Sequence, residues 1–540
     1  MELVLVGLPG SGKSAVGRRL AHAHHAEFID LDAAIEALAG APPAVIFERD
    51  GEGVFRAHEA AAIEALGEPD RGHPLTRVIA TGGGAVVAPR NRWRLFRDRR
   101  VVWLDAPDEV LARRLERSPT PRPLLAGRDP VRALQGLRAA RLRFYAAAPR
   151  VDAIGHPDEV APRVERMLRG ATPSLTVLDA DTRIGRLVLG LDMAGEAVAR
   201  ALDDLGATRV AVVSEPAAWR LHGERLAARL TAPGRLVEPL LLPRGERAKS
   251  FATLERAVRE LARRHHERAD PLVTIGGGAV GDTGGLVAAL YVRGVPLIQV
   301  PTTLLGQLDS SIGGKTAIDI PEGKNLVGAF HQPRAIVLDV GLLATLPPRQ
   351  RRAALAEAVK MAALGDAALF DLLERDGRAL AAGSPRAVEA GALAELVERC
   401  AWAKVEVVLA DEREADRRIA LNLGHSIGHA LESASGYHGL LHGEAVALGL
   451  RGAVAVGLAL GVTPAARGQR ILALLDHLGL GMAAPAVPAA DVRGRLASDK
   501  KVAGGRLRWV LPTATGIAVR ADVPVAAVEA GLAAALRGAA

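Results

Sequence analysis

The sequence predicts two α/β regions followed by a helix-rich region. In the first region, short apolar runs typical of buried parallel strands alternate with Ala- and Arg-rich helical stretches, and the runs are residues 3–6, 78–80 and 101–104. This alternation predicts a doubly wound parallel sheet. A second set of strand-like runs lies at 209–213, 272–275, 297–300 and 336–338. After residue 348, long Ala-, Leu-, Glu- and Arg-rich helices extend to about residue 480, and a short strand is expected at 507–511.

Changes in this pattern give the expected domain boundaries. Residues 163–168 are the last helical stretch of the first region, and Gly170 and Pro173 mark a linker after it. The second change follows Pro347 and Pro348, where strands give way to helices. The sequence thus predicts an α/β domain at 1–168, a linker at 169–180, a second α/β domain at 181–346 and a mainly α-helical domain at 347–540.

The composition limits the class of protein. A chain of 540 residues, 49% of them hydrophobic, is long enough for about three domains. The net charge is +8, but the Arg residues are scattered without a basic block or an aromatic platform, so nucleic acid is not an expected partner. The single cysteine, Cys400, excludes a disulfide within the chain and favours the cytoplasm. Neither a signal peptide nor a membrane span is expected, because the chain opens with a strand and has no long apolar run.

Residues 7–14 match a phosphate-binding loop, G-x-x-x-x-G-K-[ST]. The motif follows a predicted strand and precedes a predicted helix, which is the context that phosphate binding needs. Its glycines let backbone N–H groups surround phosphate oxygens, and the helix N-terminus adds positive potential. Lys13 would reach the terminal phosphates of ATP, and Ser14 would bind Mg²⁺. The expected ATP contacts in the loop are Gly7, Gly10, Ser11, Gly12, Lys13 and Ser14.

Further polar features lie downstream of this loop. Asp30 and Asp32 stand at strand spacing and would point the same way, although a helix cap with a solvated neighbour is the plainer interpretation. Arg56 precedes Glu59 by one helical turn, a spacing that by itself is typical of a surface ion pair. The remaining positions are a glycine run at Gly82, Gly83 and Gly84, Arg122 in a Pro-rich stretch suited to a lid, and Arg141 in the helix after it.

Together these residues resemble shikimate kinase over about residues 1–168. The resemblance implies phosphorylation of shikimate by ATP, with Lys13, Asp32 and Arg122 as catalytic residues. It also implies that Asp30 and Ser14 hold Mg²⁺, and that the lid residue Arg122 contacts ATP. The implied shikimate contacts are Asp32, Arg56, Gly82, Gly83, Gly84 and Arg141. Another small-molecule kinase, such as a gluconate kinase, is the nearest alternative.

The second α/β region contains a glycine-rich turn that favours a dinucleotide. Residues 271–282 are expected to form a strand, a glycine-rich turn and a helix start, and such glycines let a pyrophosphate approach the backbone. The turn alone is weak evidence. Upstream, Glu246 and Lys249 stand one turn apart, as in a helix-start salt bridge. A structural loop has no need for the dense run of polar groups that follows. These polar residues are Arg293, Thr302, Thr303, Asp309, Lys315, Thr316, Lys324 and Asn325.

The helix-rich region holds the candidate metal ligands. Glu357 and Lys360, at i,i+3, share one helix face. His425 and His429, at i,i+4, are the pair that spacing alone nominates as metal ligands, and His442 adds a third imidazole. Hydrogen-bonded core histidines are the alternative for a lone pair. Three polar residues close by in the sequence argue against that alternative, and they are Lys404, Arg418 and Asn422.

This constellation resembles 3-dehydroquinate synthase over about residues 180–540. The resemblance implies that Glu357, His425 and His442 hold one Zn²⁺ or Co²⁺ ion, and that His429 lines the substrate pocket instead. His438 is the second choice for the last ligand. The ligand set therefore rests on the resemblance, and it differs from the helical pair that spacing nominates.

The same resemblance implies the remaining contacts of this site. The implied catalytic residues are Asp309, Lys315, Lys360, Lys404, Arg418 and His429. The implied NAD contacts are Glu246, Lys249, Gly277, Gly278, Asp282, Thr302, Thr303, Lys315, Lys324 and Thr345. The implied substrate contacts are Arg293, Asp309, Lys315, Asn325, Lys360, Lys404, Arg418, Asn422, His429 and Lys500, with Lys501 as the alternative to Lys500.

Two positions bear on assembly and on cofactor binding. Arg293 matches a residue that the family presents across a dimer interface, so a homodimer through this part of the chain is expected. After the strand at 209–213, the family often carries Asp or Asn to hold the adenosine ribose of NAD. Here the chain has Ser214 and Glu215, so the residue that takes this role is open.

The implied second reaction converts 3-deoxy-D-arabino-heptulosonate 7-phosphate to 3-dehydroquinate and phosphate. Small molecules are thus the expected partners of both halves, and no direct transfer between them is expected because the two reactions are not consecutive. The alternatives are a metal-dependent polyol dehydrogenase, a related sugar-phosphate cyclase forming an inosose or valiolone, and a non-catalytic regulatory module in one half. Loss of a central residue would favour the last alternative, but Lys13, Asp32, Glu357 and His442 are all present.

Overall fold

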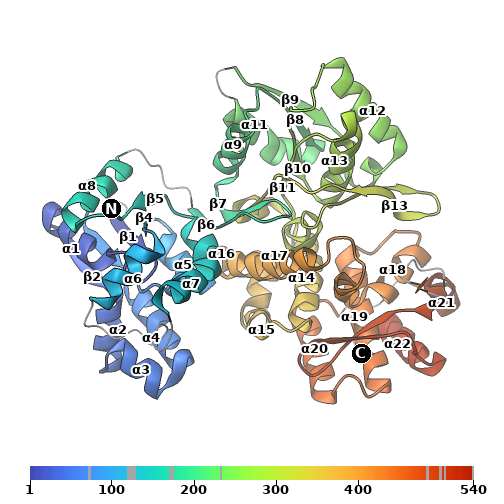
Figure 1. Cartoon of the computed structure of the whole chain (residues 1–540). Helices are drawn as coiled ribbons and strands as arrows, with labels where there is room; N and C mark the ends of the chain where they lie inside the picture. The colour runs from blue at the N-terminus through green and yellow to red at the C-terminus, as the bar shows by residue number, and fades with distance from the viewer. Residues whose placement is uncertain are drawn as a thin grey trace. The chain divides into compact units, whose positions relative to one another are not determined.

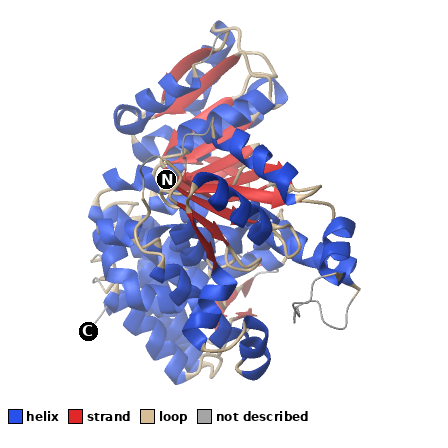
Figure 2. Ribbon diagram, turned by 90° about the vertical axis from the view of Figure 1, so that its left-hand side faces the viewer, coloured by secondary structure: helices blue, strands red, loops and turns tan. Residues whose placement is uncertain are grey.

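The computed structural model divides into two compact units, which are described here one at a time (Figure 1). It describes residues 1–70, 74–117, 129–169, 175–231, 234–481, 484, 486–497, 502–503 and 506–537. The first unit is Met1–Thr182 with Arg186–Met193, and the second is Arg183–Gly185 with Ala194–Ala540. Helices and strands alternate in both, so the predicted α/β class is confirmed (Figure 2).

A parallel five-stranded sheet in the order β2-β3-β1-β4-β5 forms the centre of the first unit. Its strands are β1 (Glu2–Val6), β2 (Glu27–Asp30), β3 (Arg77–Ala80), β4 (Arg100–Asp105) and β5 (Arg150–Asp152). Every residue of β1 is buried, as expected for a central parallel strand covered on both faces. The apolar runs predicted as strands near the N-terminus therefore lie in β1, β3 and β4.

Eight helices of the first unit are described, and α2 begins directly after the end of β2. They are α1 (Lys13–His24), α2 (Leu31–Ala39), α3 (Pro43–Arg49), α4 (Gly51–Ala65), α5 (Pro89–Phe96), α6 (Asp108–Glu116), α7 (Pro130–Tyr145) and α8 (Pro157–Leu168). Helix α1 packs against α8, and α4 packs against α2, α3 and α5. The loops that follow β1, β2 and β3 therefore lie at one edge of the sheet, where parallel strands end together.

The predicted linker at 169–180 is wrong in its C-terminal part. Residues Leu175–Ala180 form strand β6, which pairs antiparallel with β7 (Arg186–Leu191) and packs against α5 and α7. Val177 and Leu178 are buried, and Asp179 forms an ion pair with Arg186. The turn signals at Gly170 and Pro173 hid this strand because they come directly before it. The predicted boundary at 346/347 stays a prediction.

The second unit contains parallel strands in the order β14-β11-β10-β8-β9. They are β8 (Arg209–Ser214), β9 (Leu236–Leu241), β10 (Leu272–Gly276), β11 (Leu297–Pro301) and β14 (Ala335–Asp339). Between them lie α9 (Ala194–Asp204), α10 (Pro216–Ala218), η2 (Trp219–Gly223), α11 (Glu224–Leu230), η3 (Gly245–Ala248), α12 (Phe251–Arg263), α13 (Gly278–Leu290), η4 (Tyr291–Arg293), η5 (Gly306–Ser310) and η6 (Val340–Thr345). A hairpin of β12 (Lys315–Ile320) and β13 (Gly323–Phe330) follows η5.

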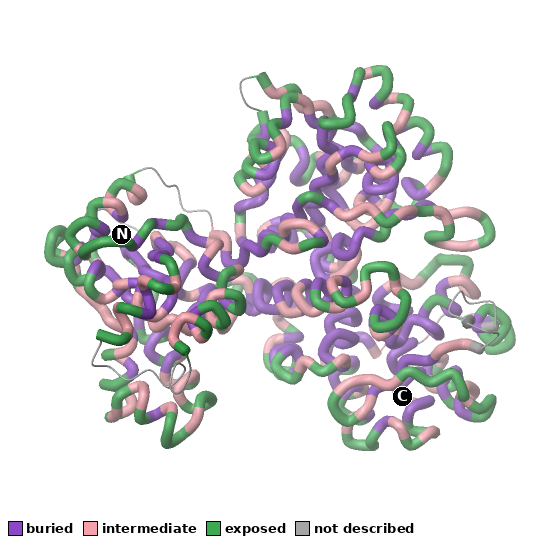
Figure 3. Tube along the Cα trace, viewed as in Figure 1, coloured by how far each residue is buried: buried purple, intermediate pink, exposed green. Residues whose placement is uncertain are grey.

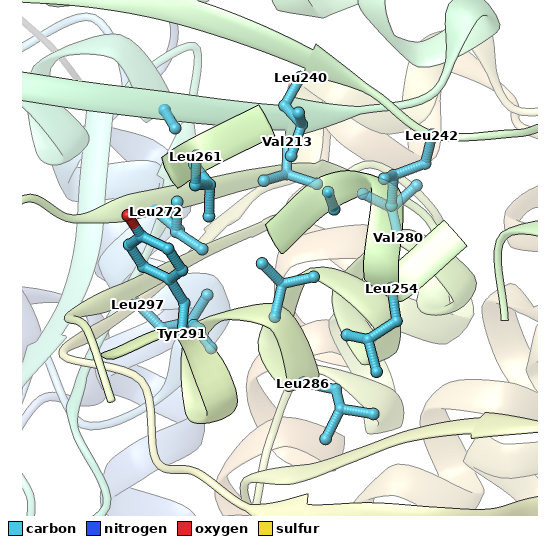
Figure 4. Packing of buried hydrophobic residues seen from close by; sticks show 14 of the residues in the cluster. Val213, Leu240, Leu242, Leu254, Leu261, Leu272, Val280, Leu286, Tyr291 and Leu297 are labelled. Carbon is cyan, nitrogen blue, oxygen red and sulfur yellow. The ribbon is translucent and has the colours of Figure 1, made fainter. Parts of the chain in front are cut away.

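Apolar side chains of α12 and α13 form a core with these strands (Figure 4). Helix α12 buries Leu254, Ala257 and Leu261, which recur at three- and four-residue spacing on one face. Ser250 caps this helix by accepting a hydrogen bond from the backbone N–H of Thr253. The strand and helix residues that meet in the core include Val213, Leu240, Leu272, Val280, Leu286, Leu297 and Tyr291.

The remainder of the second unit is mainly helical, as predicted. Its helices are α14 (Pro348–Ala363), α15 (Ala367–Ala382), α16 (Pro385–Glu389), α17 (Ala392–Ala410), η7 (Arg417–Asn422), α18 (His425–Ala434), α19 (His442–Ala459), α20 (Ala465–His477), α21 (Ala489–Ala497) and α22 (Val525–Arg537). Its strands are β15 (Val502–Ala503), β16 (Arg506–Leu507), β17 (Trp509–Pro512) and β18 (Ile517–Arg520). Helix α14 is buried at every position from 353 to 363, so its polar residues Glu357 and Lys360 lie inside the protein (Figure 3).

Helices α18 and α19 approach each other through glycine. A Cβ atom on Gly449 would lie 1.8 Å from the carbonyl oxygen of Gly424 and 2.9 Å from the backbone nitrogen of Gly428. Only a residue without a side chain permits this approach. The two helices begin at His425 and His442, so their packing determines where both imidazoles lie. Among the described residues, no helix is long and apolar enough to cross a membrane.

Substitution of Gly449 by Ala is expected to lower the free energy of unfolding of the second unit by about 1–3 kcal/mol, because the added methyl group forces α18 and α19 apart. The matched control is Gly494→Ala on α21, where an added Cβ meets no atom within 4 Å and replacing a helical glycine by alanine gains up to about 1 kcal/mol. Calorimetry of the full chain measures both changes. A Gly449→Ala variant as stable as the unchanged chain would contradict the close-contact argument.

Candidate active sites

The phosphate loop of the first unit has the backbone form that an anion site needs. Gly7, Gly10 and Gly12 have positive φ, and Gly12 is the N-cap of α1. A Cβ atom on Gly7 would lie 2.4 Å from the carbonyl oxygen of Leu104. Lys13, largely buried, donates to the carbonyl oxygens of Gly7 and Leu8 at 2.9 and 3.0 Å. The loop thus surrounds the start of α1, where N–H groups and Lys13 provide positive potential.

The glycine run at 82–84 joins the phosphate loop to the predicted acceptor site. A Cβ atom on Gly83 would lie 2.9 Å from Pro9 of the phosphate loop. A Cβ atom on Gly82 would lie 3.1 Å from Oδ1 of Asp32, and one on Gly84 would lie 2.7 Å from the guanidinium of Arg56. The structure therefore brings Asp32 and Arg56 to the same short loop.

Arg56 and Glu59 are not the surface pair that their spacing suggests. Glu59 is 2% exposed, and Nη1 of Arg56 donates to its carboxylate at 2.8 Å. Burial raises the pKa of the Glu59 carboxyl, although Arg56 and Arg141 oppose this rise. Nη1 of the buried Arg141 has no hydrogen-bond partner among the described residues. Two arginines beside one buried carboxylate leave positive charge for an anionic ligand.

The strand spacing predicted for Asp30 and Asp32 is wrong, and the helix cap named as its alternative is confirmed. Strand β2 ends at Asp30 and α2 begins at Leu31, so Asp32 lies in the first helical turn. Asp30 is the N-cap and accepts a hydrogen bond from the backbone N–H of Asp32 at 3.2 Å. A short polar side chain that caps a helix ends the strand early, which explains the error. The Mg²⁺ role of Asp30 stays a prediction, and Arg122 lies outside the described residues.

Arg114 on α6 is a contact of the phosphate loop that the sequence reasoning missed. Its guanidinium donates to the carbonyl oxygen of Gly10 at 3.4 Å and to those of Ala153 and Gly155 at 2.9 and 3.0 Å. It therefore ties the phosphate loop to the loop after β5. An isolated Arg in an Arg-rich helix gives no sequence signal for such a contact.

In the second unit, the glycine turn lies between β10 and α13. Gly277 is the N-cap of α13, and a Cβ atom on it would lie 3.1 Å from Thr303. A Cβ atom on Gly278 would lie 3.1 Å from Oγ of Ser310. Thr302 follows β11 and donates its backbone N–H to the carbonyl oxygen of Gly276. The helix N-terminus and the two threonines thus lie at the carboxyl ends of adjacent parallel strands, where dinucleotides bind.

The predicted pairing of Glu246 with Lys249 is wrong. Lys249 is buried and pairs with Asp282 at 2.7 Å and with the side chain of Asn325. Glu246 instead faces Lys324 at 3.8 Å. Lys249 is the C-cap of the 3-10 helix that carries Glu246 and has left the helical conformation, so the two side chains do not share a helix face. The predicted NAD contacts on η3, α13 and β13 nevertheless lie close together.

The residue that holds the adenosine ribose stays open. Ser214 is buried and donates its hydroxyl to the carbonyl oxygen of Ile275 at 2.7 Å. Glu215 accepts a hydrogen bond from the backbone N–H of Gly245 at 2.9 Å. The Thr345 hydroxyl, another predicted NAD contact, lies 2.8 Å from Nε2 of His222. Ser214 is therefore bound within the sheet, and Glu215 lies beside the loop that carries Glu246.

Three helices bring together the predicted metal ligands. Oε1 of Glu357 on α14 lies 3.4 Å from Nε2 of His425 and 3.4 Å from Nε2 of His442. A tetrahedral ion with ligands at about 2.1 Å separates neighbouring ligand atoms by about 3.4 Å. The centre of the His429 ring lies 5.2 Å from that of His425 and 5.8 Å from that of His442. His429 is the most exposed of the three histidines. His438 is exposed on the turn after α18.

Both ligand imidazoles present the same nitrogen to Glu357. Nδ1 of His425 faces the carbonyl oxygen of Leu423 at 3.1 Å, and Nδ1 of His442 faces Oε2 of Glu432 at 3.2 Å. These oxygens can only accept hydrogen bonds, so each Nδ1 carries a proton and each Nε2 is the nitrogen that faces the centre of the cluster. Burial lowers the pKa of His442, but Glu357 and Glu432 outweigh burial and raise it to about 10. The cluster thus favours positive charge and fits a divalent cation.

Asp309 lies between two buried lysines. Its carboxylate is 2.8 Å from Nζ of Lys404 and 3.8 Å from Nζ of Lys360, and Lys360 also pairs with Glu357. Burial opposes the charge of Asp309, but the two lysines hold its pKa below the usual value. Burial lowers the pKa of Lys404, while the carboxylates raise that of Lys360 above its usual value despite burial. These ion pairs connect Glu357, which lies beside the two histidines, to Asp309 on η5.

The segment before α18 carries the predicted residues Arg418 and Asn422 and contacts Lys315 of β12 through Glu414. Arg418 donates to the carbonyl oxygens of Gly313 at 3.1 Å and Glu412 at 2.6 Å. Its guanidinium would lie 2.5 Å from a Cβ atom on Gly313, which has a positive φ. Lys315 and Asn422 lie at the same loop. Arg293 is exposed and has a φ of 68°, and Lys500 and Lys501 lie outside the described residues.

Glu414 is a site residue that the sequence reasoning missed. Its carboxylate pairs with Lys315 through one oxygen and accepts a hydrogen bond from Nδ2 of Asn422 at 3.2 Å through the other. Asp411 supports this loop by accepting the backbone N–H groups of Ala415, Asp416 and Arg418. The run of acidic residues from 411 to 416 was a possible signal, but a charged loop is usually solvated.

Comparison with known proteins identifies both halves. A shikimate kinase model matches residues 9–168, a 3-dehydroquinate synthase N-terminal model matches 239–353, and a 3-dehydroquinate synthase C-terminal model matches 354–502. The 3-dehydroquinate synthase of Pelobacter propionicus is 46% identical over 307 residues, which cover 56% of this chain and 83% of that protein. The chain belongs to the shikimate kinase and 3-dehydroquinate synthase families.

Further relatives match the synthase half, which is the second unit. The 3-dehydroquinate synthase of Caulobacter vibrioides is 44% identical over 63% of this chain and 92% of its own length. A solved 2-epi-5-epi-valiolone synthase of Streptomyces hygroscopicus with NAD⁺ and Zn²⁺ bound is 32% identical, with a TM-score of 0.58 over 65% of this chain and 96% of that chain. The synthase half thus has the fold of NAD-binding cyclases. The kinase half is residues 9–168, which the shikimate kinase model matches.

Replacement of Glu414 by Ala is expected to lower kcat/KM of the synthase half about tenfold or more, because Lys315 and Asn422 lose their shared partner. The matched control is Glu412→Ala, which removes a neighbouring exposed carboxylate that contacts Gln332. Steady-state kinetics of both synthase and kinase activities measure the effect. Equal synthase rates for the two variants would exclude Glu414 from the site.

Proposed function

We propose that the kinase half transfers the terminal phosphoryl group of ATP to shikimate, and that the synthase half converts 3-deoxy-D-arabino-heptulosonate 7-phosphate to 3-dehydroquinate and phosphate. The observation that carries the second assignment is the convergence of Glu357, His425 and His442 beside the lysine-flanked Asp309 in the unit that holds the dinucleotide turn. Family membership supports both assignments.

In the kinase half, binding and orientation account for most of the chemistry. The backbone N–H groups of the phosphate loop and Lys13 would bind the phosphates of ATP, and Arg122 is proposed to contact them as well. Ser14 and Asp30 would hold Mg²⁺, which neutralises phosphate charge when bound. Asp32 would hold the acceptor hydroxyl next to Gly82 and take its proton. Arg56 and Arg141 would bind the carboxylate of shikimate, and Glu59 fixes Arg56 in the orientation that this requires.

In the synthase half, Glu357, His425 and His442 would hold Zn²⁺ or Co²⁺, which supplies Lewis-acid polarisation of a substrate hydroxyl when bound. NAD⁺ supplies a reversible hydride acceptor when bound at the glycine turn. The residues proposed to bind it are Glu246, Lys249, Gly277, Gly278, Asp282, Thr302, Thr303, Lys315, Lys324 and Thr345.

The cationic side chains of the synthase half would orient the phosphate and carboxylate of the substrate. The proposed substrate contacts are Arg293, Asp309, Lys315, Asn325, Lys360, Lys404, Arg418, Asn422, His429 and Lys500. Asp309 holds Lys404 in place and opposes the lowering of its pKa by burial. Glu414 holds Lys315 and Asn422 at one loop, and its carboxylate can accept a proton there. His429, the most exposed of the three histidines, would contact a substrate hydroxyl beside the cluster.

The alternatives named from the sequence fit less well. A polyol dehydrogenase has no use for a cluster of phosphate-binding cations such as Lys315, Lys404 and Arg418. A related cyclase is favoured by the valiolone synthase structure at 32% identity, but 3-dehydroquinate synthases reach 46%. We also propose a homodimer through the synthase half, with Arg293 presented to the partner site, and a cytoplasmic location.

Single substitutions are expected to separate the two activities. Lys13→Ala should lower ADP formation from ATP and shikimate by at least about 100-fold, because the terminal phosphates lose their cation, and it should leave phosphate release from heptulosonate phosphate unchanged. Glu357→Ala should abolish phosphate release from heptulosonate phosphate and leave ADP formation unchanged, because the proposed metal site loses its charged ligand. Coupled assays on the full chain measure both rates. A wild-type chain that forms ADP with gluconate but not with shikimate would sink the kinase assignment.

Metal removal is expected to affect the two halves differently. Dialysis against a chelator should abolish phosphate release from heptulosonate phosphate, and Zn²⁺ or Co²⁺ but not Mg²⁺ should restore it, because imidazole ligands select transition metals. The kinase rate of the same sample should need Mg²⁺ alone. Undiminished phosphate release from a chain shown to be metal-free by elemental analysis would refute the proposed metal role.

A further inference from the structure

A buried carboxylate lies outside the proposed ligand set and contacts one of its members. Glu432 is on α18 and is 6% exposed. Oε2 lies 3.2 Å from Nδ1 of His442 at the start of α19, and Oε1 lies 3.9 Å from Nζ of Lys324 on β13. Glu432 therefore joins a proposed metal ligand to the hairpin that carries proposed NAD contacts.

The two ligand histidines differ in the group that holds Nδ1. His425 uses the backbone carbonyl of Leu423, which carries only a partial charge. His442 uses the full charge of Glu432. A carboxylate on Nδ1 fixes the ring with Nε2 directed at Glu357 and makes Nε2 a stronger electron-pair donor to a metal ion. The orientation and the donor strength of His442 thus both depend on Glu432.

Lys324 partly neutralises Glu432 and so weakens the effect of this carboxylate on His442. Its ammonium group lies 3.9 Å from Glu432, 3.8 Å from Glu246 and 4.6 Å from the centre of the Tyr437 ring. Lys324 is partly exposed, so it can move toward an anionic ligand at the dinucleotide turn. After such a movement, Glu432 would interact with His442 and no longer with Lys324.

We propose that Glu432 is a positioning residue that holds His442 in its metal-binding tautomer and, through Lys324, couples metal binding to dinucleotide binding. NAD draws Lys324 away from Glu432, which strengthens the donor nitrogen of His442 and tightens metal binding. By thermodynamic reciprocity the metal tightens NAD binding by the same factor. This inference rests on the proposed function, because it needs both the metal and NAD at this site.

The first experiment titrates Co²⁺ alone into the metal-free full chain and follows the visible absorption of bound Co²⁺. Glu432→Ala is expected to weaken Co²⁺ binding 10- to 100-fold, and Glu432→Gln less, because its amide oxygen still accepts the hydrogen bond from Nδ1. The matched control is Glu444→Gln, which alters a buried carboxylate two residues after His442 that pairs with Arg349. Unchanged circular dichroism and kinase rates verify folding. Wild-type Co²⁺ affinity in both Glu432 variants overturns the proposal.

The second experiment repeats the titration with saturating NAD⁺. The wild-type chain should bind Co²⁺ several-fold more tightly with NAD⁺ than without it. Lys324→Met should bind Co²⁺ without NAD⁺ as tightly as the wild type does with NAD⁺, and added NAD⁺ should change nothing further. A Lys324→Met variant with the wild-type response to NAD⁺ refutes the coupling. A wild-type chain that binds no Co²⁺ refutes the proposed function instead, so the two failures are distinct.

Discussion

A carboxylate buried in the middle of helix α14 constrains the whole synthase half. Glu357 is 1% exposed, and an uncompensated charge at that depth costs several kcal/mol. Burial alone would raise its pKa, yet Lys360 and His425 hold the pKa well below the usual value. The compensating groups come from α14 itself, from α18 and from α19. The three helices must therefore dock in one register for the charge to be tolerated, and that register brings Glu357, His425 and His442 together.

The kinase half meets the same constraint with a different set of groups. Glu59 is as deeply buried, and its partners are the guanidinium groups of Arg56 and Arg141. Guanidinium groups cannot donate electron pairs to a metal, so this arrangement favours a small anion in place of a cation. A buried carboxylate thus favours a cation in the synthase half and an anion in the kinase half. The side chains that surround the carboxylate determine the sign of the ligand charge.

The sequence predicted the fold class and most central strands because buried parallel strands are continuous apolar runs. It missed the hairpin β12–β13, whose second strand alternates between exposed and half-buried residues, and it missed β6 behind its turn signals. Relations within one helix, such as Glu357 with Lys360, were readable from spacing. Glu414 and Glu432 were not, because their partners lie on other elements. The helix cap at Asp30 shows that even a local pattern misleads when a strand ends within it.

The glycine contact between α18 and α19 has a consequence for how the chain acquires its metal. The proposed ligands lie on three separate helices, and two of them are in place only after the backbones of α18 and α19 have met at Gly424 and Gly449. In a zinc finger the ion gathers ligands from an unfolded peptide and drives its folding. Here Glu357 precedes His425 by 68 residues, so the loop between them has to close before the full ligand set exists. Metal uptake is then a late event of biogenesis, because the complete ligand set exists only in chains whose three helices have docked.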